Sequence, residues 1–213
     1  MKKIIFILLL MPLLANAKFF KGSIKFSNGN NLSGFVQFPE PTDNFVKFKL
    51  SEDGKKEKYS IDEVEKLEIF LDNNQKVTIV ALQTYSVSLF KGVSKEPSKE
   101  KFWLVLVYDG KLKIYNADVV SYSSTASPNS QSVANNSTRY YFKSPNKEYS
   151  QFVYADFGAG NAVIGGKFKY FIKAAEAYFQ NDCPKFSSTI QKSDFEKGME
   201  RIGELYDSNC GKP

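Results

Sequence analysis

Carboxylate side chains are the first candidates for chemistry in this sequence. Two carboxyl groups placed on either side of a sugar can act as acid and base, or as acid and nucleophile, in a glycoside hydrolase. The chain offers two clusters of this kind, namely Asp62, Glu63 and Glu65, and then Glu196, Glu200 and Glu204. Because the second cluster alternates with Lys197 and Arg201, its spacing is that of any exposed helix face. We therefore expect solvated surface at both places and assign no catalytic residue.

Histidine is absent from all 213 residues, and this narrows the possible chemistry. Ser-His-Asp and Cys-His nucleophilic sites are excluded, as are zinc and haem sites that use histidine ligands. Catalysis would have to use carboxylates, lysine, tyrosine, serine or cysteine. We expect no metal site and no cofactor.

The chain has two cysteines, Cys183 and Cys210, whose spacing excludes a CxxC redox pair. In an exported protein, two cysteines are expected to form a disulfide. Closing a loop of this length stabilises a fold by roughly 3–4 kcal/mol in the chain-entropy model. We predict a structural disulfide between them.

Aromatic side chains make up 15% of the sequence. Exposed rings can bind sugars or peptides, although a β-rich domain also needs aromatic residues for its core. The candidates for exposure are Phe19, Tyr85, Tyr141 and Tyr170.

The N-terminus has the three zones of a secretory signal peptide. Two lysines precede an uncharged apolar run over residues 4–14, and Ala15-Asn16-Ala17 then offers the small side chains that a signal peptidase recognises. A membrane anchor would need about 20 apolar residues, which is longer than this run. We predict that residues 1–17 are removed by cleavage between Ala17 and Lys18. No later segment is long and apolar enough to span a bilayer, so we expect a periplasmic, outer-membrane-associated or extracellular protein.

The net charge of +6 is mild for a chain of this length. Cleavage would remove two lysines and leave 27 basic against 23 acidic residues, or +4. A dense basic patch and a nucleic-acid-binding motif are both missing from the sequence, so we expect no nucleic-acid partner. The spread of lysines along strands favours a solvated sheet face, with loose attraction to an anionic envelope or polysaccharide as the alternative. These lysines are Lys21, Lys25, Lys47, Lys49, Lys111 and Lys113.

Residues 18–157 have the alternating pattern of β-strands. In the first of them, Phe20, Ile24 and Phe26 share one face, and a turn at residues 27–30 predicts a hairpin. We expect about nine to eleven antiparallel strands in a meander, barrel-like or sandwich body. Residues 102–108 are apolar on both faces, which is typical of a strand that is covered on each side.

Residues 123–138 are rich in serine and asparagine and predict a flexible loop, because they could bury little apolar surface.

Residues 158–213 change to a helical period. A glycine-rich hinge leads into an amphipathic helix that includes Phe168 and Phe179, and a short helix follows Cys183. Ser193 to Glu196 fits a capping box for a last helix that continues to Tyr206. The whole is a mainly β, α+β protein with a C-terminal, disulfide-linked helical unit.

Several segments resemble an uncharacterised family of exported proteins typical of Bacteroidetes. They are KGSIKFSNGNNLSGFVQF, YSIDEVEKLEI, KLKIYNADVVSY, RYYF, YFQNDCPKFSSTI and LYDSNC, spread over most of the chain after the signal peptide. The family has no assigned activity, so the resemblance implies a compartment and a layout and no functional residue.

These observations favour a non-enzymatic exported protein of the cell envelope, or a secreted one, that has a binding or structural role. Its partner would be an envelope protein or a glycan, and peripheral association with the envelope is compatible with the sequence. A carboxylate-based glycan hydrolase is the first alternative, and it should bring two carboxylates together in a pocket. An adhesin or assembly subunit is the second, and it should leave a sheet edge open for strand addition.

Overall fold

A computed structural model describes most of the chain after the predicted signal peptide. The described residues are 18–73, 75–85, 87–88, 92–93, 96–123, 133–157 and 166–210. The predicted signal peptide with its Ala17–Lys18 cleavage site, the centre of the predicted loop and most of the glycine-rich hinge lie outside these ranges.

The protein is mainly β with a C-terminal helical unit, as the sequence predicts. The strands of its large sheet are β1 (Phe19–Phe26), β2 (Asn31–Gln37), β3 (Phe45–Lys49), β4 (Glu57–Ser60), β5 (Val64–Phe70), β6 (Lys76–Tyr85), β9 (Lys101–Asp109), β10 (Lys113–Ser123), β11 (Val133–Lys143) and β12 (Ser150–Asp156). A separate two-stranded antiparallel sheet is formed by β7 (Val87–Ser88) and β8 (Gly92–Val93), which lie between β6 and β9 in the sequence.

The sheet closes on itself at one end. Its order is β12-β11-β10-β9-β6-β5-β1-β2-β3-β4, and β12 also pairs with β6. Five strands, β6 and β9 to β12, therefore form a closed ring. A ring of five strands that run alternately up and down must bring two parallel strands together, and here Ser150 and Gln151 pair with Thr84 and Tyr85 in parallel. The body is thus mainly antiparallel, with this one parallel pairing in a mixed sheet.

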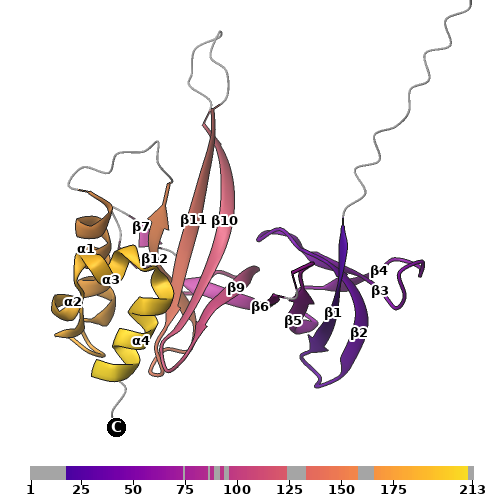
Figure 1. Ribbon diagram of the computed structural model, residues 1–213, viewed down its shortest axis with the longest axis horizontal. Coiled ribbons are helices and arrows are strands. Elements are labelled where there is room, and N and C mark those ends of the chain that lie inside the picture. The colour runs from indigo at the N-terminus through magenta and orange to yellow at the C-terminus, as the bar shows by residue number, and fades with distance from the viewer. Residues whose placement is uncertain are drawn as a thin grey trace, which may run out of the picture.

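Strands β6 and β9 form a partition between two lobes (Figure 1). On one side lies the N-terminal lobe of β1 to β5, whose core includes Ile79 of β6 and Trp103 of β9. On the other side lies the interior of the ring, where Leu104 is buried. The strand with two apolar faces is thus covered on each side, which confirms the prediction for residues 102–108.

Phe20, Ile24 and Phe26 all pack in the N-terminal core, as their alternation predicts. The following turn has Gly29 at a φ of 88°, a conformation that favours glycine, and it joins β1 to β2 as a hairpin.

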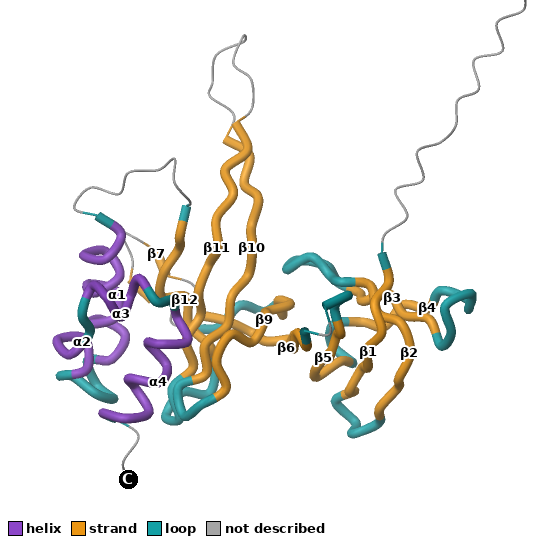
Figure 2. The backbone as a smooth tube through the Cα atoms, in the orientation of Figure 1, coloured by secondary structure: helices purple, strands orange, loops and turns teal. Residues whose placement is uncertain are grey.

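The helices cover the outside of the ring, on the side away from β1 to β5 (Figure 2). They are α1 (Lys167–Phe179), α2 (Phe186–Thr189), α3 (Lys192–Glu196) and α4 (Met199–Asn209). Their apolar faces pack on Ile114, Phe142 and Tyr154 of the ring strands. The predicted disulfide between Cys183 and Cys210 is present, with a Cα–Cα distance of 5.9 Å.

Two sequence predictions about local structure are wrong. Strand β11 begins at Val133, inside the predicted loop, because the outer part of β10 supplies backbone partners for residues with weak strand signals of their own. The last helix is interrupted at Gly198, whose φ of 101° separates α3 from α4. Its capping box is formed by Gln191 and Asp194, and not by a box that starts at Ser193.

None of the described helices combines the length and the apolar composition needed to cross a bilayer.

Candidate functional site

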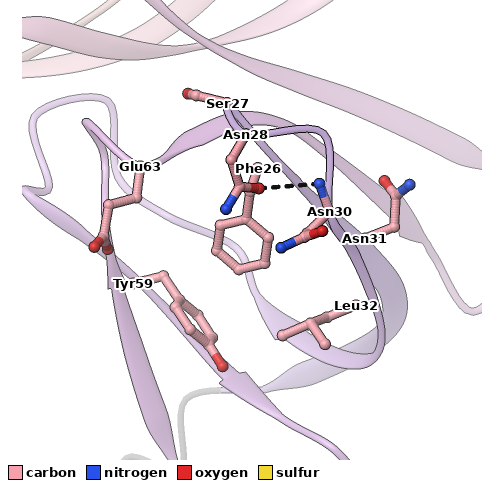
Figure 3. A pocket seen from close by; sticks show the side chains of 8 residues that line it. All are labelled: Phe26, Ser27, Asn28, Asn30, Asn31, Leu32, Tyr59 and Glu63. Atoms are coloured by element: carbon pink, nitrogen blue, oxygen red, sulfur yellow. Dashed lines mark hydrogen bonds between the residues drawn. The ribbon is translucent and has the colours of Figure 1, made fainter.

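Among the hollows of the described surface, one in each lobe has a volume above about 600 Å³. The first is a shallow notch of about 610 Å³ at the tip of the β1–β2 hairpin (Figure 3). Its lining consists of Phe26, Ser27, Asn28, Asn30, Asn31, Leu32, Tyr59 and Glu63.

Two polar side chains of the notch, those of Asn28 and Glu63, already stabilise the turns that carry them. The backbone N–H of Asn30 donates to Oδ1 of Asn28 at 3.0 Å, as Figure 3 shows. Oε2 of Glu63 accepts the N–H of Ser60 at 3.1 Å. A ligand would have to displace these hydrogen bonds or bind through the remaining polar groups, so the notch is a weak candidate for a ligand site.

Tyr59 forms the floor of the notch together with Phe26, edge to face at 5.0 Å between ring centroids. Its hydroxyl donates to the carboxylate of Glu57, and this bond raises the pKa of Tyr59 to about 12. A tyrosine held protonated in this way is a structural hydrogen-bond donor and a poor base at neutral pH.

The second hollow lies at the end of the ring, beside the β6–β12 pairing, and we name it the ring mouth. Its volume is about 740 Å³, within the range typical of small-molecule sites. The described lining consists of Thr84, Tyr85, Glu96, Pro97, Ser98, Phe102, Arg139, Tyr141, Phe152, Ala155, Phe157 and Tyr170.

Six of these side chains are aromatic, and they come from strands β6, β9, β11 and β12, from the segment after β12 and from helix α1. Tyr141 and Phe152 lie on paired strands and meet edge to face at 5.9 Å. Phe157 is 40% exposed, so apolar surface reaches the opening. Closure of the ring is what brings these side chains together, because Tyr85 and Phe152 belong to strands that touch only there.

Arg139 is the cation of the ring mouth. Burial raises the pKa of Tyr141 and Arg139 partly offsets that rise, so the phenol remains neutral at physiological pH. Arg139 has no carboxylate partner among the described ion pairs, whereas Glu96, also in the lining, has an interaction of its own. The guanidinium can therefore accept an anionic group from a ligand.

Three of the four aromatic candidates from the sequence, Tyr85, Tyr141 and Tyr170, lie together in the ring mouth. Tyr141 is only 8% exposed, so it lines the interior and is not the exposed platform that was expected. Phe19 lies in the other lobe, beneath the ammonium groups of Lys49 and Lys56.

Sequence reasoning missed Phe102, Phe152 and Arg139. The two phenylalanines lie in strands that read as core, and their place at an opening depends on ring closure. Arg139 stands two residues before Tyr141, so both side chains point to the same face of β11, a signal that the strand period could have given.

The two carboxylate clusters do not converge on a pocket. Glu63 lines the notch without a second member of its cluster, and others, such as Glu65 and Glu204, lie in exposed ion pairs. Two other carboxyl groups, Glu68 and Asp194, have a lowered pKa because Lys66 and Arg201, respectively, donate hydrogen bonds to them. A general acid needs the opposite shift.

Among the described residues, no group of three or more side chains is arranged to hold a metal ion.

Comparison with known proteins gives no relative: no family model, no curated protein and no solved structure matches the chain.

Proposed function

We propose that this chain is a non-enzymatic exported binding protein, and that the ring mouth takes up a small ligand with an apolar or aromatic body and an anionic group. The observation that carries the proposal is the convergence of six aromatic side chains on one hollow whose described lining has one guanidinium, that of Arg139. Aromatic walls with a few placed polar groups are the usual composition of a ligand site. In such an environment a charge-assisted hydrogen bond from Arg139 is stronger than in water.

The composition of the ring mouth favours binding over hydrolysis. Glu96 is the one carboxylate in its described lining, whereas glycoside hydrolysis ordinarily requires a pair. The adhesin alternative has little support from the sheet edge at β4. This strand has four residues, including Glu57 and Lys58, and short charged edges discourage strand addition.

Two fluorescent probes of the same shape test the proposal. One is the anion 1-anilinonaphthalene-8-sulfonate, and the other is neutral N-phenyl-1-naphthylamine. We expect both to bind the folded protein with saturation. Arg139→Gln should weaken binding of the anionic probe by about tenfold, the effect of losing one charge-assisted hydrogen bond. Binding of the neutral probe should remain nearly unchanged.

Ser98→Trp should fill the hollow and weaken the binding of both probes. The matched control is Ser193→Trp, which adds the same side chain at an exposed position of α3 and should bind like the wild type. Equal binding of both probes by Ser98→Trp and by the wild type would exclude the ring mouth as the site.

A further inference from the structure

The outer face of the N-terminal lobe carries lysine and phenylalanine in alternation across five strands. Lys76 of β6 pairs with Phe70 of β5, and Lys21 of β1 pairs with Phe35 of β2. Since Gly22 pairs with Ile69, the register places Lys21 opposite Phe70, and Phe35 in turn pairs with Lys49 of β3. We name this set the lysine–phenylalanine row: Lys76, Phe70, Lys21, Phe35 and Lys49.

The row faces away from the core. Directly paired residues point to the same side of a sheet, and the neighbours of the row along the chain, Val36, Phe48 and Ile69, are fully buried on the opposite side. Phe70 is 44% exposed, and neither it nor Phe35 belongs to a described core cluster.

Like charges face each other on this side of the lobe. Lys47 lies directly opposite Lys58, and Lys25 lies directly opposite Lys66. Such pairs destabilise a sheet by themselves. Glu65 pairs with Lys25, and Glu68 pairs with Lys66 and also with Lys76 of the row. Lys47 and Lys58 have no carboxylate among the described ion pairs.

Phe19 extends the same surface toward the β3–β4 turn. The ammonium groups of Lys49 and Lys56 lie 4.8 and 5.7 Å from the centre of its ring. Apolar and cationic side chains are therefore mixed over one continuous face, which is the composition of surfaces that meet both hydrocarbon and negative charge.

We propose that this face docks on a lipid surface that contains anionic headgroups, with the lysines at the phosphates and the phenylalanine rings at the boundary between headgroups and acyl chains. Neighbouring strands are about 4.8 Å apart, so lysines on alternate strands stand roughly 10 Å from one another, close to the spacing of headgroups. Phenylalanine has no hydrogen-bonding group, so a hydrated glycan would gain less from these rings than a bilayer would. This face is separate from the ring mouth, and the proposal does not depend on ligand binding there.

Sedimentation with vesicles tests the proposal. We expect the protein after signal removal to bind vesicles of phosphatidylcholine with one third phosphatidylglycerol, and to bind pure phosphatidylcholine much more weakly. Reversing three charges of the row in Lys21→Glu/Lys49→Glu/Lys76→Glu should reduce binding at least about 100-fold, since each basic side chain near an anionic surface contributes about a factor of five.

The matched control reverses three exposed lysines of the helical unit, Lys169→Glu/Lys173→Glu/Lys185→Glu, and has the same net charge. It should keep most of the binding, because its row is intact. Phe70→Ser should weaken binding at high salt as well as at low salt, which a purely electrostatic attraction would not show.

Three outcomes would overturn the proposal. They are equal binding to neutral and anionic vesicles, equal loss in the two triple variants, and tighter binding of a single-stranded oligonucleotide than of anionic vesicles. The last would identify the rings as a stacking platform for bases.

Discussion

The two lobes differ in the composition of the cores that stabilise them. The buried core of the N-terminal lobe is mostly aliphatic, with Phe48 and Trp103 as its two aromatic members. In the core under the helices, half of the buried side chains are aromatic, and their rings form a connected network in which Phe179 touches Phe186 and Tyr206. The N-terminal lobe is held by strand pairing around its mostly aliphatic core, whereas the helical unit includes two helices of only four and five residues and is cross-linked by the disulfide.

This difference also separates the proposed activities. In the aliphatic lobe, Phe26 and Tyr59 line only the shallow notch, and three other phenylalanines, Phe19, Phe35 and Phe70, lie on the outside. The aromatic lobe directs its rings inward and leaves a hollow at the end of the ring. A surface for docking and a cavity for a ligand thus occur in different halves of one sheet.

Removal of the disulfide should change the relative stabilities of the two lobes more than any other substitution considered below. Cys183→Ser/Cys210→Ser should destabilise the helical unit by about 3–4 kcal/mol, because the unfolded chain regains the freedom of a loop with a sequence separation of 27. Trp103 is the single tryptophan and lies in the N-terminal core, so its fluorescence reports on that lobe, while far-ultraviolet circular dichroism reports on the helices. We expect the dichroism transition in urea to shift more than the fluorescence transition. Equal shifts would mean that the two lobes unfold as one unit.

Gly203 of α4 offers a sharper test of how closely the helices pack on the ring. Alanine in place of an exposed helix glycine usually stabilises by about 1 kcal/mol. Here an added Cβ would lie 2.2 Å from the ring of Tyr108, whose hydroxyl is held by Asp207 at 2.9 Å. We expect Gly203→Ala to cost about 1–3 kcal/mol in urea denaturation. In a Tyr108→Ala background the same change should cost little, and a full cost there would contradict the contact.

Two buried tyrosines of the aromatic core should respond with opposite signs to the loss of a hydroxyl. The oxygen of Tyr178 accepts the N–H of Ser144 at 3.0 Å, and Ser144 is buried, so Tyr178→Phe should cost about 1–3 kcal/mol. The hydroxyl of Tyr154 is buried, and it has no hydrogen-bond partner among the described residues. Tyr154→Phe should therefore be neutral or stabilise by up to about 1 kcal/mol. Thermal denaturation of the two variants side by side measures the difference, and a loss of stability in both would show that Tyr154 has a partner, such as a bound water.

The N-terminal lobe could be predicted from the sequence because its information is local. The alternation of Phe20, Ile24 and Phe26 assigns one face to the core, and a turn that includes Gly29 fixes the hairpin. The same alternation places Lys21 and Lys25 on the outer face. Their alignment with lysines of other strands depends on register, which a single strand does not reveal.

The ring mouth could be predicted only in part. Its tyrosines were named as candidates for exposed, ligand-binding rings. The pocket itself exists because Thr84 and Ser150, far apart in the sequence, pair in parallel. The break before α4 was missed because the apolar spacing from Phe195 to Met199 is helical even though Gly198 leaves the helical conformation. The disulfide was predictable from the cysteine count and the signal peptide together. The compartment that the signal peptide implies, and the family that the sequence resembles, stay predictions.

The parallel contact between β6 and β12 has a consequence for the order of events during synthesis. Chains fold broadly from their N-terminus as they emerge, and distant contacts form late because a long loop must first be closed. The first lobe can assemble soon after β9 has appeared, but the fifth strand of the ring arrives only with residue 150. The ligand hollow is therefore completed last, so a chain that stops short of β12 would present a finished outer face and no cavity.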